Sequence, residues 1–302
     1  TVRGYKEGYQ VRLVDAVNPI VIENSSATNV NFVLSTEMPV QLFAPWNGFL
    51  GNVVIVEIFN TGTVDLDVLL KLYKSEGSEA GTEAGRLRYS VPVGAQRDII
   101  VNDMPGFQAD RYGVLKVEMS STSYNGQVSY YKISPEGDGF STAQIPGDDF
   151  DYAFGNPFVQ PITGTSYVGF NTMQPSGEVA EKEYLVPNWL TIINGESSTA
   201  KYFRIRKYNT LGKRIAIPDN IGTITSLCQA SKNELRCKVP ALGRIDIDGG
   251  HVYPGPGNIG SVEIIPEDNT GKYVADLVRY GMAAPPTVYT VRYKFATNLQ
   301  AR

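Results

Sequence analysis

The stretch Val91-Pro-Val-Gly-Ala-Gln-Arg-Asp-Ile99 returns later in the chain as Val239-Pro-Ala-Leu-Gly-Arg-Ile-Asp-Ile247. Both stretches begin with Val-Pro and end with Asp-Ile, and the same number of residues separates the two pairs. Proline lacks a backbone N–H, so it is tolerated best at the entrance of a strand, which is where this pattern puts Pro92 and Pro240. Because sequence that recurs in register indicates a repeated structural unit, these stretches predict two copies of one module.

Four further landmarks recur around this one, in the same order in both copies. Each copy has an apolar stretch closed by asparagine at both ends, a second apolar stretch followed by glycine, a strand led by glycine, and a final aromatic stretch. The pairs are residues 52–60 and 188–194, 68–77 and 203–212, 113–117 and 260–264, and 125–131 and 270–280. Landmarks that keep one order predict an internal repeat between residues 52–133 and 188–281.

Polar and apolar residues alternate within each copy with a period of two. Phe203 and Ile205, for example, alternate with Arg204 and Arg206, which is typical of a strand with one buried and one exposed face. The 302 residues include 30 Gly, 18 Pro and 18 Tyr, and only 19% are charged. Such a composition is typical of many short strands joined by tight turns. We therefore predict an all-β fold of two tandem antiparallel β-sandwich domains related by the internal repeat.

The predicted domain boundary lies in a stretch rich in glycine, proline and aspartate. Residues 135–161 hold these residue types too densely for regular structure and predict a linker. The first domain then covers residues 1–134 with an N-terminal strand segment, and the second covers residues 162–302. A chain of this length can form two domains that each bury a core.

Both cysteines fall in an insertion of the second copy. That copy has 13 more residues than the first between its glycine landmark and its Val-Pro landmark, 27 positions against 14. Cys228 and Cys237 predict a disulfide that staples this excursion and stabilises the fold by about 2–3 kcal/mol. Two buried free cysteines, or half of a metal site, are the alternatives that the spacing leaves open. A disulfide favours an oxidising compartment, so we expect an extracellular or cell-surface location.

The Asn-closed stretch, the Val-Pro and Asp-Ile landmark and the tyrosine-rich last strand resemble the immunoglobulin-like or fibronectin-like modules found in tandem on bacterial surface and secreted proteins. The resemblance covers about two thirds of the chain and concerns architecture. The Cys…Trp…Cys core of antibody domains is absent from the sequence, because Trp46 and Trp189 have no matching cysteines.

The sequence carries no recognisable reaction centre. His251 is the only histidine, so histidine-dependent catalysis would require it, and its Gly- and Pro-rich loop favours a surface residue instead. We predict that the chain is not an enzyme and needs no cofactor, with calcium as the one candidate ion. Asp148, Asp149 and Asp151 supply closely spaced oxygen ligands of the kind that bind calcium. A solvated acidic linker is the alternative interpretation of these aspartates.

Aromatic residues in turn-like contexts are the other candidate binding residues. Trp46 and Tyr124 lie beside Asn-Gly turns, and Tyr253 follows His251 in the Gly- and Pro-rich loop. A β-sandwich that binds sugars or a partner protein uses tyrosine and tryptophan in this way. Core packing or turn capping is the alternative for Trp46 and Tyr124. These residues support one alternative function, a carbohydrate-binding accessory module of an exported enzyme system.

The charge and the hydropathy of the chain exclude two classes of partner, nucleic acid and the membrane interior. A net charge of −4 supplies no basic surface for nucleic acid, and no apolar run approaches the about 20 residues that a membrane-spanning helix needs. Tandem sandwiches without a reaction centre favour a non-enzymatic extracellular structural or adhesive protein, displayed on a surface or assembled into a fibre. Its expected partners are other protein subunits or surface glycans. Strand-rich termini also favour a homo-oligomer or polymer assembled by strand donation.

Overall fold

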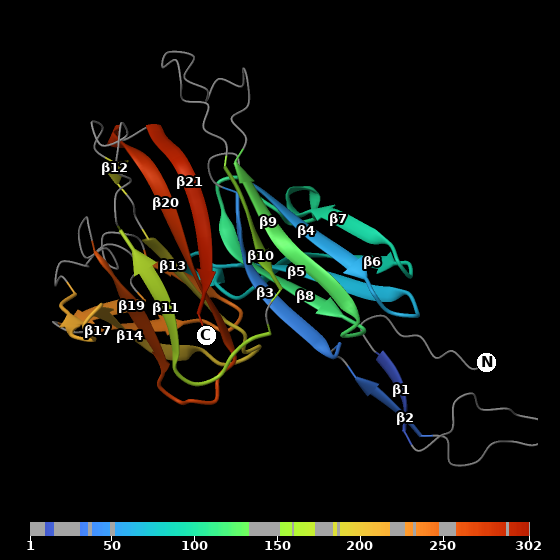
Figure 1. Ribbon diagram of the computed structural model, residues 1–302. Helices are drawn as coiled ribbons and strands as arrows, with labels where there is room; N and C mark the ends of the chain where they lie inside the picture. Colours follow the sequence, from blue (N-terminus) through green and yellow to red (C-terminus); the bar gives the residue numbers. More distant parts are fainter. Residues whose placement is uncertain are drawn as a thin grey trace, which may run out of the picture.

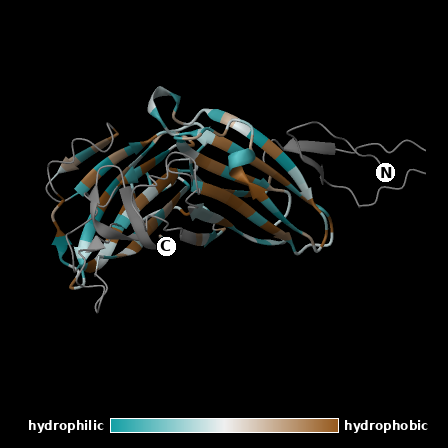
Figure 2. Cartoon of the chain, turned by 90° about the horizontal axis from the view of Figure 1, so that it is seen from above, coloured by the Kyte–Doolittle hydropathy of each residue, from teal (hydrophilic) through white to brown (hydrophobic). Residues whose placement is uncertain are grey.

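The computed structural model describes residues 10–14, 31–35, 38–48, 52–132, 152–158, 160–172, 184–185, 188–217, 227–231, 234–247, 258–287 and 290–301. The described strands form five antiparallel sheets, and the described helices are two single 3-10 turns, Gly77–Glu79 and Val101–Asp103. Hydrophobic and hydrophilic residues alternate along the strands (Figure 2), as expected where one face is buried and the other is wet. The predicted all-β class is confirmed.

The described part of the first half of the chain, residues 38–158, forms two four-stranded sheets around one core (Figure 1). Its strands are β3 (Val40–Asn47), β4 (Asn52–Asn60), β5 (Leu66–Lys74), β6 (Glu83–Val91), β7 (Gln96–Ile100), β8 (Tyr112–Met119), β9 (Tyr124–Lys132) and β10 (Tyr152–Pro157). One sheet has the order β3-β8-β5-β6 and the other β10-β9-β4-β7. The core takes Leu42, Leu70 and Leu115 from the first sheet and Val56 and Val128 from the second.

The second half, residues 160–301, forms two sheets around a core of its own. Its strands are β11 (Ser166–Asn171), β12 (Tyr184–Leu185), β13 (Asn188–Asn194), β14 (Lys201–Asn209), β15 (Arg214–Ile215), β16 (Cys228–Ser231), β17 (Glu234–Val239), β18 (Arg244–Ile247), β19 (Ile259–Pro266), β20 (Tyr273–Thr287) and β21 (Thr290–Gln300). The order β11-β19-β14-β17 matches β3-β8-β5-β6 strand by strand, and β21-β20-β13-β18 matches β10-β9-β4-β7.

The asparagines that end β4 and β13 explain why these landmarks recur. Asn60 Nδ2 donates to the carbonyl of Val91 at 2.9 Å, and Asn194 Nδ2 donates to the carbonyl of Val239 at 3.1 Å. Each side-chain oxygen also accepts the backbone N–H two residues later, at 2.8 Å and 3.0 Å. The buried amide therefore ties the end of one strand to the Val-Pro landmark of the opposite sheet.

We expect Asn60→Ala to lower the free energy of unfolding by about 2 kcal/mol, because it leaves buried backbone groups without hydrogen-bond partners. Urea denaturation measures the change. Asn125→Ala, on an exposed residue of β9, is the matched control. Equal losses in the two variants would contradict the buried role of Asn60.

One segment, inside the predicted linker, differs from the sequence prediction. Residues 152–157 lie inside the predicted linker but form β10, which pairs with β9 along its whole length. Phe154 stacks on Tyr130 with 5.0 Å between ring centroids, so aromatic packing stabilises the strand. The glycines and prolines around it in the sequence had predicted a linker instead. Near the N-terminus, β1 (Gln10–Val14) and β2 (Asn31–Ser35) pair with each other in a separate two-stranded sheet (Figure 1).

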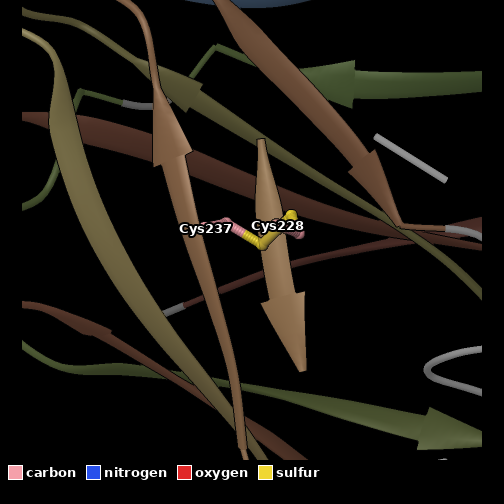
Figure 3. The surroundings of a disulfide bond; sticks show 2 residues. All are labelled: Cys228 and Cys237. Atoms are coloured by element: carbon pink, nitrogen blue, oxygen red, sulfur yellow. A yellow bond between two sulfur atoms is a disulfide. The ribbon is translucent and has the colours of Figure 1, made fainter. Parts of the chain in front are cut away.

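Cys228 and Cys237 form a disulfide, as predicted. The two cysteines lie directly opposite each other on β16 and β17, with their Cα atoms 4.1 Å apart (Figure 3). Strand β16 extends its sheet beyond β17, whereas the matching sheet of the first half ends at β6. The disulfide therefore fastens an edge strand to the body of the second half.

Replacement of both cysteines by alanine should lower the free energy of unfolding by about 2 kcal/mol, at the low end of the usual range because the closed loop is short. Thermal unfolding with and without reductant measures it. The double variant should be insensitive to reductant, and an unchanged midpoint in the wild type on reduction would contradict the stabilising role.

Candidate functional site

The two halves are joined by a buried contact. Strand β10 lies beside β21, and β3 packs against β13 (Figure 1). Six buried apolar residues form one cluster across the contact, here called the interface cluster: Phe43, Tyr73 and Val114 from the first half and Ile193, Leu242 and Val274 from the second. Gly81 has a φ of +83°, and a Cβ there would lie 2.1 Å from the carbonyl oxygen of Ala241. Only glycine therefore fits this approach without a backbone shift.

Arg244 is the polar centre of this contact. Its guanidinium donates to the carbonyl of Trp46 at 2.8 Å and to the carbonyl of Gly113 at 2.9 Å, both in the first half. It also pairs with Asp246 on its own strand at 2.9 Å and lies 4.8 Å from the ring centroid of Tyr112. Because the side chain is only 6% exposed, these contacts fix the second half against the backbone of the first.

Asp276 is a buried acid on the same face of the second half. The residue is 3% exposed, and its Oδ1 accepts no hydrogen bond from the described residues. Burial raises the pKa of Asp276 to about 7. Burial, with the charge of Asp276 nearby, also raises the pKa of Tyr130, whose hydroxyl donates to the carbonyl of Pro45 at 2.9 Å. The contact therefore holds a carboxyl group that titrates near neutral pH.

A pocket of about 230 Å³ lies next to this contact, at the end of the first half where β3, β5 and β8 meet. Its lining includes two aromatic residues and four charged ones: Trp46, Tyr112, Lys74, Glu76, Glu79 and Arg111. Lys74 pairs with Glu79 at 3.0 Å, and Arg111 pairs with Glu76. Charges of both signs thus line the pocket in matched pairs, and none of these four residues is left as an unpaired ion.

Trp46 is the predicted ligand residue that the structure brings to this pocket. The side chain is 1% exposed, its indole N–H donates to the carbonyl of Tyr73 at 3.1 Å, and its ring packs against Phe107. Trp46 therefore forms a wall of the pocket and is also a core residue. Trp46 does not provide the flat, exposed stacking surface that is expected of a sugar-binding tryptophan.

Tyr124 lies elsewhere, at the start of β9. It is half-buried and packs edge-on against Phe158, with 6.2 Å between ring centroids. Tyr124 does not line the pocket. Its packing against Phe158 agrees with the alternative interpretation, in which Tyr124 is a packing residue. The other predicted site residues, His251, Tyr253, Asp148, Asp149 and Asp151, lie outside the described residues.

Sequence reasoning missed Arg244, Asp276 and the charged residues of the pocket. Arg244 stands inside the Val-Pro and Asp-Ile landmark, where it served only as a marker of the repeat. Asp276 stands among apolar residues of β20, and an acid in an otherwise buried strand is the one signal that could have pointed to it.

The chain matches no protein-family model and no curated protein. Within the described ranges, no group of three or more His, Cys, Asp or Glu side chains is placed to hold a metal ion. Neither described helical turn has the length or apolar character that a membrane crossing requires.

Proposed function

We propose that the chain consists of two tandem antiparallel β-sandwich domains related by an internal repeat. Three observations support this: the matching strand order of the two halves, the separate cores, and the equivalent hydrogen bonds of Asn60 and Asn194. Equivalent buried polar contacts at equivalent positions are what duplication of one module produces.

We further propose that the protein is a non-enzymatic extracellular structural or adhesive protein, displayed on a surface or assembled into a fibre. The observation that carries this proposal is the contact made by Arg244 and the interface cluster. Domains joined by small polar interfaces move relative to each other by default. A buried apolar cluster with a fully engaged arginine makes the pair one stiff unit, which suits a component that bears load or presents a surface.

The disulfide between Cys228 and Cys237 supports the extracellular part of the proposal. Structural disulfides persist in oxidising compartments and are rare where thiols are kept reduced.

The hairpin of β1 and β2 supports assembly by strand donation. It pairs with none of the other described sheets, and an isolated two-stranded hairpin is only marginally stable in water. Addition to the sheet edge of a second copy would satisfy its backbone groups and link the subunits.

Size-exclusion chromatography with light scattering, followed by electron microscopy, tests this assembly. The full chain should form oligomers or fibres, and deletion of residues 1–23, which removes β1, should leave monomers. Deletion of residues 1–9, which keeps both strands, is the matched control and should still assemble. A full chain that stays monomeric at high concentration, or a 1–23 deletion that assembles normally, would overturn strand donation.

A further inference from the structure

We propose that the pocket beside Trp46 binds one ring of a neutral sugar, as the terminal residue of a glycan would present it. The inference deepens the proposed adhesive function and rests on it for its biological meaning. Sugar binding itself is measured on the isolated chain, so binding and assembly can fail separately.

The size of the pocket limits the ligand to one small molecule. Sites for drug-sized ligands have volumes of about 300–1,000 Å³, and this pocket, at about 230 Å³, is smaller. It can take one sugar ring with its hydroxyl groups, but not an extended oligosaccharide. The remainder of a glycan would have to lie outside it.

The charges of the pocket favour a neutral ligand. Lys74 and Arg111 are each paired with a glutamate, Glu79 and Glu76 respectively. An anion would have to compete with these carboxylates, and a cation with the ammonium and guanidinium groups. Hydroxyl groups both donate and accept, so they can bind between paired charges without separating them.

Two buried acceptors in this region lack partners. Glu76 lines the pocket and uses one carboxylate oxygen for Arg111, while its Oε1 accepts no hydrogen bond among the described residues. The hydroxyl of the adjacent Ser75, a residue only 5% exposed, is also without a partner there. Buried polar atoms are normally satisfied, and an orphaned one at a pocket calls for an explanation. Since Oε1 itself has almost no accessible surface, a ligand hydroxyl supplies the missing donor when the carboxylate, whose side chain is 27% exposed, turns toward the pocket.

Aromatic rings complete the recognition. Trp46 and Tyr112 line the same pocket. Because Trp46 is only 1% exposed and Tyr112 is half-buried, Tyr112 is the ring that can pack against the C–H face of a sugar while polar groups hold its hydroxyls. Tyr112 is held by the guanidinium of Arg244 and Trp46 by its hydrogen bond to Tyr73. Both walls are therefore fixed before a ligand arrives, which lowers the entropic cost of binding.

Ligand-observed NMR and titration calorimetry on the full chain test the proposal. The probes are the methyl glycosides of glucose, galactose, mannose and N-acetylglucosamine, with inorganic phosphate and acetate as charged competitors. At least one glycoside should bind, and Glu76→Gln should weaken it at least tenfold because the substitution replaces an anionic acceptor and frees Arg111. Glu267→Gln is the matched control, since Glu267 also pairs with an arginine, Arg236, and lies on the second half, away from the residues that line the pocket.

Three results would overturn the proposal: no glycoside binds, only the anions bind, or Glu76→Gln binds as tightly as the wild type. Thermal unfolding of each variant checks that it folds. If Glu76→Gln proves unstable, Glu79→Gln takes its place, because Glu79 lines the same pocket and its side chain is 65% exposed. Unchanged affinity in that variant would also count against the site.

Discussion

Replacement of Arg244 by alanine is expected to lower the free energy of unfolding by about 3–5 kcal/mol. The substitution leaves Asp246 as a largely buried carboxylate without its cation and removes the donor from the carbonyls of Trp46 and Gly113. Because Arg244 joins the halves, we also expect the variant to lose cooperativity, with two transitions in urea where the wild type shows one. Circular dichroism and tryptophan fluorescence measure the two effects.

Arg236→Ala is the matched control for this experiment. Arg236 also makes a bidentate pair with a carboxylate, that of Glu267, but its side chain is 44% exposed and both residues of the pair belong to the second half. An exposed pair contributes at most about 1 kcal/mol. If Arg244→Ala costs no more than Arg236→Ala and unfolds in one step, the two halves are not locked by this arginine.

The pH dependence of stability should change most on replacement of Asp276 by asparagine. Burial raises the pKa of Asp276 from 3.8 to about 7 in the folded chain. The folded state therefore holds the proton more tightly than the unfolded state, so the stabilisation is present at acid pH and is lost as the pH rises through 7. Between pH 5 and pH 8 the wild type should lose about 2–3 kcal/mol through this group.

Asp276→Asn should remove this loss, because an amide stays neutral at every pH in that range. Urea denaturation at several pH values measures the slope in both proteins. Asp65→Asn, in an exposed turn, is the control and should keep the wild-type slope. A steep wild-type slope that persists in Asp276→Asn would assign the titration to another group.

The strands could be predicted because the signals for them are local. Alternation with a period of two requires only that one face of a strand is wetter than the other. Asn60 and Asn194 make equivalent hydrogen bonds, each to the carbonyl of the valine that precedes proline in its own half. The cysteine pair could be predicted for a similar reason, since the two residues are 9 positions apart and sit on neighbouring strands. Strand β10 was missed because its packing partner, Tyr130, lies beyond a stretch rich in glycine and proline.

The burial of equivalent positions could not be predicted from the sequence pattern. Within the repeated landmark, Gln96 and Asp98 occupy the positions of Arg244 and Asp246, and the side chains pair at 2.9 Å in both copies. In the first half that pair is exposed, whereas Arg244 in the second half is buried. Nearly the same sequence pattern therefore faces solvent in the first half and is buried in the second.

The sequence by itself determined the all-β class and the disulfide, because each depends on residues near one another in the chain. Only the tertiary structure decided which outward positions become buried. Arg244 reaches carbonyls 131 and 198 residues away, and the pocket draws its walls from three strands and the turns between them. Such sites form where surfaces that are distant in the sequence pack together. The free energy of this packing depends on the three-dimensional shapes of the surfaces, which a local sequence pattern does not encode.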